Sequence, residues 1–328
     1  TLRHTLFPYT TLFRSLAKTA ISALQAEGGT ELLRGLQAGL GQLGKRQHRD
    51  VVSHLILLTD GRTYGDDEGC IAAAARAGER GIGISAMGIG EDWNDDLLDE
   101  MASRSGGESI YIAWPGQVRT LLQRKVRRLG SVFAKGLTLT VRSADGVQVE
   151  TAYQTDPSLE RLNLSDGTTR LGSVGVDAPV KALLEIAVER RPPGEHRLLQ
   201  FELSGDVPHR DRRDERLRQD IWCVFSQDEV SESGKNVPLR ILNALSRVTL
   251  YRMQEQAWSA LEEGHVERAT CQLEMVATRL LNLGKKRLAQ ATMLEAEHIA
   301  MKGNSTSRGR KQVKYGTRSL EIGRDTHD

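Results

Sequence analysis

The chain has 328 residues, of which 39% are hydrophobic and 27% charged, the composition of a globular protein with room for two or three domains and a sizeable core. No apolar run approaches the roughly 20 residues of a membrane span, and a net charge of +2 gives no overall attraction to nucleic acid. The three cysteines, Cys70, Cys223 and Cys271, show no disulfide framework and no CxxC metal pair, which favours a reducing, cytoplasmic location.

Residues 1–15 differ in character from the rest of the chain. Thr5 to Ser15 reads Thr-Leu-Phe-Pro-Tyr-Thr-Thr-Leu-Phe-Arg-Ser, which resembles the in-frame translation of a sequencing-library adapter. The alternative is an amphipathic leader or targeting peptide. We expect the first interpretation, so that the native chain is entered near Leu16, already inside a domain.

Residues 16–131 alternate between helical and strand patterns. The predicted helices cover 16–24, 32–43, 68–80, 94–104 and 115–129, and the predicted strands cover 55–58, 82–87 and 109–113. Repeated strand and helix units of this length predict an α/β fold with a parallel sheet and right-handed crossovers.

The composition changes after residue 131. Residues 136–226 carry short strand patterns at 137–141, 147–153, 159–164, 180–188, 198–203 and 221–225. Turns such as Asp145-Gly146 and Asp166-Gly167 separate them, which predicts an antiparallel β-sandwich without catalytic residues. Residues 237–301 have a helical pattern throughout. Residues 302–328 are basic and rich in Gly, Ser and Thr, and we predict a disordered tail.

Two oxygen-bearing side chains form the candidate site. The run Leu55 to Leu58 has no polar alternation, so it predicts a parallel strand covered on both faces that delivers Asp60 to its carboxyl end. Thr30 follows Gly28-Gly29 at the start of a predicted helix. A hydroxyl and a carboxylate on adjacent loops suit a hard cation such as Mg²⁺. The alternatives are a simple turn at Asp60-Gly61 and a helix N-cap at Thr30.

In order, these pieces resemble the latter half of a von Willebrand factor A (vWA) domain of bacterial type. The resemblance spans Leu16 to about Gly130 and includes Gly28-Gly29-Thr30, Thr59-Asp60-Gly61 and Ser105-Gly106-Gly107. It implies a partial doubly wound parallel sheet. It also implies that Thr30 and Asp60 are ligands, direct or through water, of a metal-ion-dependent adhesion site. In such a site the open position of a Mg²⁺ ion takes an acidic side chain from a protein partner.

The chain departs from this family pattern in one respect. The Asp-x-Ser-x-Ser loop that supplies most of the other ligands is absent, and only residues 16–29 separate Ser15 from Thr30. We therefore expect the first strands of the domain to be lost, and predict that the chain binds Mg²⁺ weakly or not at all. The strand at Leu55 would be left as an unpaired apolar edge, which predicts aggregation or partial disorder.

The function that this pattern favours is metal-dependent binding of a protein partner, of the adhesion or scaffold type. The alternative is a non-catalytic subunit of a chelatase-like or ATPase-linked complex. An enzyme is not expected, because no Walker motif and no nucleophile elbow occur in the sequence. Nucleic-acid binding, which only the basic tail would support, is not expected either.

Overall fold

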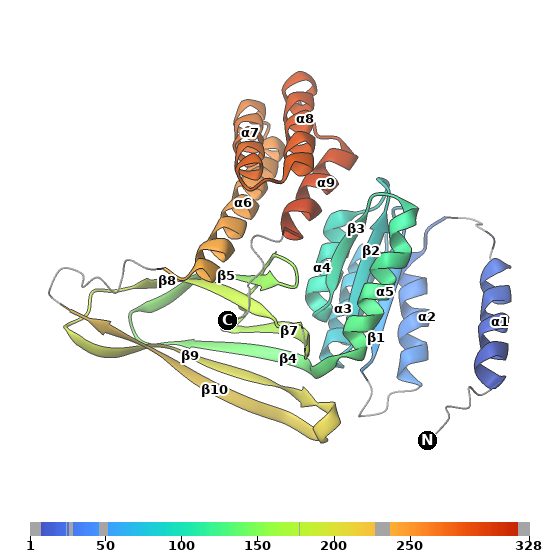
Figure 1. Ribbon diagram of the computed structural model, residues 1–328, viewed down its shortest axis with the longest axis horizontal. Helices are drawn as coiled ribbons and strands as arrows, with labels where there is room; N and C mark the ends of the chain where they lie inside the picture. Colours follow the sequence, from blue (N-terminus) through green and yellow to red (C-terminus); the bar gives the residue numbers. More distant parts are fainter. Residues whose placement is uncertain are drawn as a thin grey trace.

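The computed structural model describes residues 8–23, 25, 29–45, 52–176, 178–226 and 237–320. Along the chain the helices and strands are α1 (Pro8–Ser22), α2 (Leu32–Gly44), β1 (His54–Thr59), α3 (Asp67–Glu79), β2 (Gly83–Ile89), α4 (Asp95–Ser105), β3 (Glu108–Ile112), η1 (Pro115–Gln117), α5 (Val118–Gly130), β4 (Val132–Ser143), β5 (Val147–Asp156), β6 (Glu160–Arg161), β7 (Thr168–Gly175), β8 (Lys181–Val188), β9 (Gly194–Val207), η2 (Pro208–Arg210), β10 (Arg212–Phe225), α6 (Leu239–Glu262), α7 (Val266–Asn282), α8 (Lys286–Lys302) and α9 (Ser307–Arg318). The predicted order of a parallel α/β region, an antiparallel β region and a helical region is confirmed (Figure 1).

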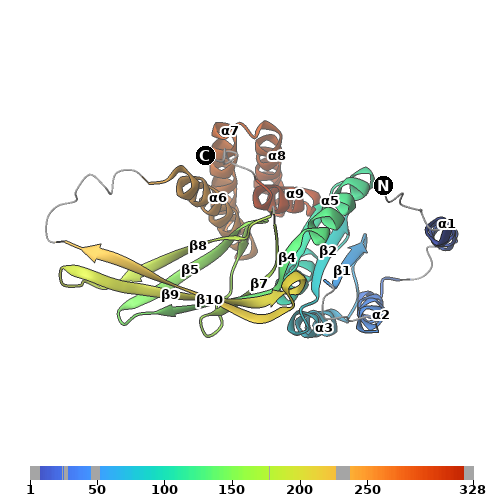
Figure 2. The same cartoon turned by 60° about the horizontal axis from the view of Figure 1, so that its bottom comes forward.

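The first region is a parallel sheet in the order β1-β2-β3. Helices α2, α3 and α4 cover one face, and α5 lies on the other (Figures 1 and 2). Side chains of β2 such as Ile84 and Ala86 are fully buried on the first face, together with Leu36 of α2 and Met101 of α4. The run predicted as a buried strand at 82–87 therefore forms the core, as a parallel strand between helices should. The prediction that Leu55 to Leu58 are covered on both faces is wrong, because β1 is an edge strand: Leu55 and Leu57 are partly buried against this core, and Leu58 is exposed.

Strand β1 is an edge of this sheet. Within the part of the chain that the structure describes, it pairs only with β2, and Leu58 near its end is 40% exposed. Helix α1 stands apart from the sheet (Figure 2). The unpaired edge expected from the sequence is thus present, whereas aggregation in solution stays a prediction. Helix α1 includes part of the segment 1–15, and the origin of that segment also stays a prediction.

The second region consists of two antiparallel sheets, in the orders β10-β9-β4-β7 and β6-β5-β8. Their facing side chains form one apolar core, which includes Val141, Val147, Leu198, Leu199 and Phe201. This is the predicted sandwich. Strand β7 and the charged first half of β10 were not predicted.

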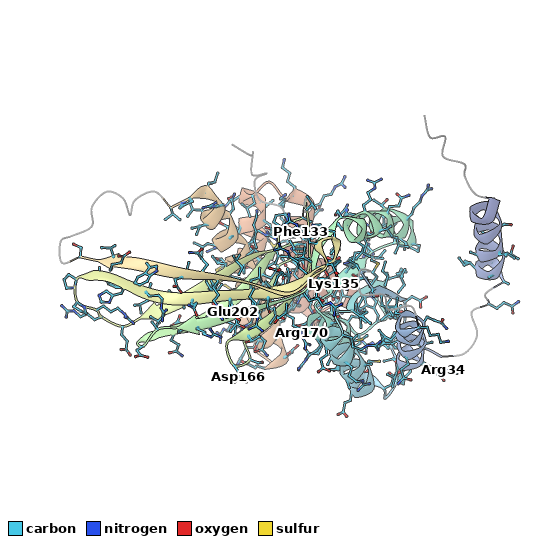
Figure 3. The ribbon with its side chains drawn as sticks, turned by 90° about the horizontal axis from the view of Figure 1, so that it is seen from below. Arg34, Phe133, Lys135, Asp166, Arg170 and Glu202 are labelled. Carbon is cyan, nitrogen blue, oxygen red and sulfur yellow. The ribbon has the colours of Figure 1, made fainter. Side chains whose placement is uncertain are left out.

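The two regions meet at a pair of glycines. Gly106, which ends α4, and Gly172 of β7 have φ angles of 69° and 76°, and a Cβ atom on Gly172 would lie 2.1 Å from the carbonyl oxygen of Gly106. Glycine at both positions allows this left-handed backbone and the close approach. Beside them, Arg170 donates to the carbonyl oxygen of Arg104 over 3.3 Å, at the junction visible from below in Figure 3.

The third region comprises helices α6 to α9, and it corrects one prediction. The tail from residue 302 was expected to be disordered, but Ser307–Arg318 forms α9, and its Lys314 and Tyr315 are buried. The reason is that the basic residues of α9 pair with acidic residues of α4, so that Lys314 lies 2.6 Å from Asp95 and 2.9 Å from Asp99. Residues 321–328 lie outside the described residues.

Among the described helices, none combines the length and the apolar character that crossing a membrane would require.

Candidate functional site

The carboxyl ends of the three parallel strands meet at one edge of the first sheet. Thr59 of β1 pairs in register with Gly88 of β2, and Ile89 of β2 pairs with Ile112 of β3. Asp60 follows β1 directly and is exposed. The predicted position of this carboxylate, at the edge where ligands of open α/β sheets bind, is therefore the observed one.

Thr30 lies next to the loop that carries Asp60. A Cβ atom on Gly61 would be only 2.9 Å from the hydroxyl oxygen of Thr30, and the hydroxyl of Thr63 donates to the Thr30 carbonyl over 3.1 Å. The structure thus places the two residues that the sequence singled out on neighbouring loops. Gly28, which belongs to the same motif, lies outside the described residues.

Thr30 does not cap helix α2. The N-cap position is Glu31, whose side chain makes no capping bond. Instead, the backbone N–H of Leu32 donates to the hydroxyl of Thr63 over 3.3 Å, and that of Leu33 donates to a carboxylate oxygen of Asp66 over 2.8 Å. Side chains of the loop after β1 therefore accept the first backbone N–H groups of α2, so the hydroxyl of Thr30 is not needed as a helix cap.

The carboxylate of Asp60 is not used by the turn that contains it. The turn is closed by the hydroxyl of Thr59, which donates to the carbonyl of Gly61 over 3.0 Å. Among the described residues, the Asp60 side chain has no hydrogen bond and no ion pair. An exposed carboxylate on a loop next to the Thr30 hydroxyl is an arrangement that can accept a cation.

These two residues fit a divalent cation in kind but not in number. Mg²⁺ takes about six oxygen ligands, several of them waters in most protein sites. Thr30 and Asp60 offer one hydroxyl and one carboxylate, and the described part of the chain contains no group of three or more His, Cys, Asp or Glu residues placed to hold a metal. The described residues therefore supply part of a coordination sphere.

Sequence reasoning missed three residues near this edge. Thr63 and Asp66 lie three and six positions after Asp60 and fasten its loop to α2; their spacing as Thr-x-x-Asp is a signal that could have been read. Lys311 comes from α9 and binds the loop between β2 and α4. No local sequence pattern predicts this contact, because Lys311 and Trp93 are 218 residues apart in the sequence.

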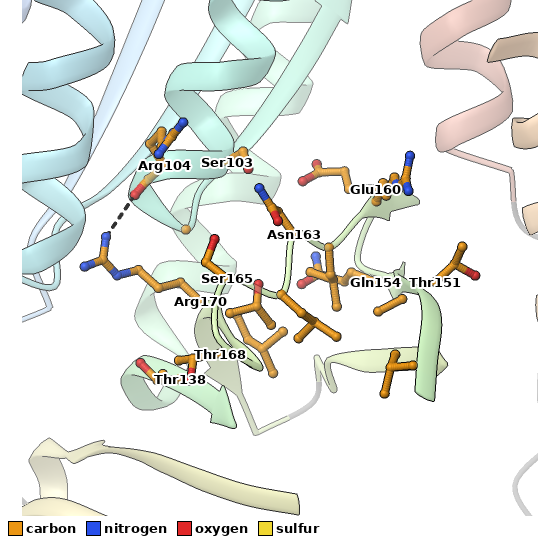
Figure 4. A pocket seen from close by; sticks show the side chains of 18 of the residues that line it. Ser103, Arg104, Thr138, Thr151, Gln154, Glu160, Asn163, Ser165, Thr168 and Arg170 are labelled. Atoms are coloured by element: carbon orange, nitrogen blue, oxygen red, sulfur yellow. Dashed lines mark hydrogen bonds between the residues drawn. The ribbon is translucent and has the colours of Figure 1, made fainter. Parts of the chain in front are cut away.

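A separate cleft of about 910 Å³ lies at the opposite end of the parallel strands, between α4 and the β-sandwich (Figure 4). Arg104, Arg161 and Arg170 line it, as do Glu100 and Glu160. Burial raises the pKa of Glu160 to about 7, against a hydrogen bond donated by Ser158. The mixed charges and exposed rims give this cleft no single preferred ligand, so the candidate site remains the carboxyl edge.

Comparison with known proteins matches two parts of the chain to family models. Residues 13–110 match the von Willebrand factor type A domain, and residues 239–321 match the Sll0103-like, C-terminal alpha-helical domain. The uncharacterized protein sll0103 of Synechocystis sp. is 25% identical over 266 residues, an alignment covering 79% of this chain and 62% of that protein. The chain thus spans less than two thirds of the length of this curated relative.

Two solved structures share the fold. The von Willebrand factor type A protein from Catenulispora acidiphila is similar with a TM-score of 0.73 and 16% identity, over 94% of this chain and 75% of that one. The human COPII-coat protein Sec24c is similar with a TM-score of 0.53 and 13% identity, over 95% of this chain and 46% of that one. At these identities the likeness concerns the fold alone.

Proposed function

We propose that this protein, whose residues 13–110 match the von Willebrand factor type A domain, is a non-catalytic protein-interaction module that binds its partner through the carboxyl edge of the first sheet, with help from a divalent cation. The single observation that supports this proposal most is the meeting of Thr30 and Asp60 at that edge.

Thr30 and Asp60 would hold the cation through one hydroxyl and one carboxylate oxygen. The bound cation would supply positive charge for an acidic side chain of the partner. The free carboxylate of Asp60 is already exposed, and the hydrogen bonds of Thr63 keep the Thr30 loop next to it. The loops of this edge are therefore ordered before a ligand binds, which lowers the conformational-entropy cost of binding.

A non-catalytic role agrees with the chemistry of this edge. The two side chains are a carboxylate and a hydroxyl, which are groups that can hold a cation, and the neighbouring carboxylate of Asp66 is occupied by hydrogen bonds from Leu33 and Thr63. With only two protein ligands, we expect the affinity for Mg²⁺ to be millimolar or weaker.

An NMR titration of the full chain with Mg²⁺, followed by addition of acetate as a carboxylate probe, tests the proposal. We expect shift changes confined to the amides of 29–33 and 59–63, with half-saturation at millimolar Mg²⁺, and a further change of the same amides with acetate. Asp60→Asn abolishes both effects. Asp145→Asn, which removes an exposed acid of the β-sandwich, leaves them unchanged. The proposal is wrong if Asp60→Asn responds as the unmodified chain does, or if the responding amides lie elsewhere.

A further inference from the structure

Lys311 of α9 is only 2% exposed, although lysine is rarely buried to this extent. Its ammonium donates to the carbonyl oxygen of Glu91, to that of Trp93 over 2.7 Å and to the hydroxyl of Ser307 over 3.2 Å. All three N–H groups thus have a neutral acceptor. Burial lowers the pKa of Lys311. A lysine buried against two carbonyl groups fixes the backbone that carries them.

The two carbonyl groups belong to the loop that joins β2 to α4, at the same carboxyl edge as Asp60. Ser307, the first residue of α9, donates from its hydroxyl to the carbonyl of Glu91 over 2.7 Å. Ser307 and Lys311, from the first two turns of α9, therefore both donate to the carbonyl oxygen of Glu91 in this loop. Figure 1 shows α9 beside α4 and the ends of β2 and β3.

Trp93 extends the contact toward the candidate site. The ammonium of Lys311 lies 4.5 Å from the centre of the Trp93 ring, a cation–π distance. The same ring rests on β2 so closely that a Cβ atom on Gly88 would lie 2.0 Å from it. Gly88 pairs in register with Thr59, the residue before Asp60. Packed or hydrogen-bonded contacts thus lead from Lys311 through Trp93 and Gly88 to the end of β1.

The rest of α9 fixes its orientation on α4. Lys314 pairs with Asp95 and Asp99, and Arg318 pairs with Asp99 over 2.7 Å. Tyr315 packs against Trp93, with ring centres 5.7 Å apart. A helix held at both ends in this way is a rigid support rather than a frayed terminus.

We propose that α9 positions the carboxyl edge of the first sheet, with Lys311 as the positioning residue. Docked α9 holds the β2–α4 loop and, through Trp93, the end of β1 in the arrangement that places Asp60 beside Thr30. A link between α9 docking and the affinity for a cation rests on the proposed function, whereas the order of the edge does not. Through this link, a partner that binds the helical region would alter binding at the edge, and the reverse effect would be equal.

Hydrogen exchange of the full chain, read by mass spectrometry, tests the positioning role. In Lys311→Met we expect exchange in peptides covering 57–65 and 90–98 to be at least tenfold faster, with unchanged protection in α7. Lys302→Met, which removes an exposed lysine from the last turn of α8, is the matched control and keeps the original rates throughout. Unchanged exchange at 57–65 in Lys311→Met overturns the proposal. Equally faster exchange in α7 also overturns it, because the effect is then a general loss of stability.

The Mg²⁺ titration described above gives a second readout that a general structural role would not move. We expect Lys311→Met to weaken the Mg²⁺ response of amides 59–63 at least fivefold and Lys302→Met to leave it unchanged. Equal affinity in Lys311→Met and the unmodified chain refutes the link. If the unmodified chain shows no Mg²⁺ response, the proposed cation site fails, while exchange at 57–65 still decides the positioning role.

Discussion

The guanidinium of Arg318 donates to the carboxylate of Asp99 over 2.7 Å and so joins the last helix to α4 across 219 residues of sequence. The same carboxylate accepts from the hydroxyl of Tyr315 over 2.8 Å and pairs with Lys314 over 2.9 Å. Burial alone would raise the pKa of Asp99, but Arg318 and Lys314 outweigh it and hold that pKa below its ordinary value. Three side chains of α9 therefore contact one carboxylate, and for Arg318 that carboxylate supplies its ion pair.

Replacing Asp99 by Asn should destabilise the protein strongly. The substitution removes the carboxylate with which the buried Arg318 pairs, and the loss of one member of a buried ion pair costs about 3 to 5 kcal/mol. Lys314 keeps its ion pair with Asp95. We expect Asp99→Asn to lower the free energy of unfolding by an amount in this range, measured by urea denaturation followed by circular dichroism. The control is Glu100→Gln, which breaks a largely exposed pair with Arg104 and should cost about 1 kcal/mol or less. Equal losses in the two variants would show that the Asp99 cluster contributes no more than a surface pair.

Glu160 should make stability fall as the pH rises. Its pKa is raised to about 7 by burial, whereas the unfolded chain has the ordinary value near 4.5. Between these two values the folded state binds the extra proton, so each pH unit removes up to about 1.4 kcal/mol of stability. We expect Glu160→Gln to lose this slope between pH 4.5 and 7, as seen in urea midpoints across that range. Glu150→Gln, an exposed acid in the same cleft, should retain the slope. Parallel pH profiles for the unmodified chain and Glu160→Gln would exclude a titration of Glu160 in this window.

Gly88 should tolerate no side chain. An added Cβ atom would lie 2.0 to 2.4 Å from the Trp93 ring, inside contact distance, so Trp93 or β2 must move. Overpacking of this kind costs about 1 to 3 kcal/mol. We expect Gly88→Ala to lower the melting temperature in thermal unfolding. Gly41→Ala, in helix α2 with no heavy atom within 4 Å of the new Cβ, should raise stability by about 0.5 to 1 kcal/mol. A melting temperature of Gly88→Ala equal to that of the unmodified chain would mean that Trp93 yields without cost.

The sequence predicts the parallel sheet well because the features that mark its strands and helices lie within those segments themselves. Apolar runs without alternation mark β1 and β2, and the glycines after α4 mark its end. The placement of Thr30 beside Asp60 followed from strand ends and family resemblance together. The prediction that these residues bind Mg²⁺ weakly or not at all stays open to measurement.

The missed elements are those whose reason to form lies elsewhere in the molecule. The first half of β10 is charged on both faces and forms a strand because Arg218 and Arg216 lie near Glu202 on β9. Helix α9 has the composition of a solvated tail, and its lysines are buried because α4 offers acids and the β2–α4 loop offers carbonyl groups. Pairing between residues so far apart produces no hydrophobic periodicity from which these elements could be predicted.

The burial of Tyr315 in the core of the first region has a consequence for biosynthesis. This side chain packs against Trp93 and Tyr111, about 200 residues earlier in the chain. Ribosomes add about 5 to 20 residues per second, so the first sheet must wait roughly 10 to 40 seconds for its last aromatic residue. During translation the core around Trp93 and Tyr111 is therefore incompletely packed. We expect chaperones to bind the nascent sheet until helix α9 has been synthesised.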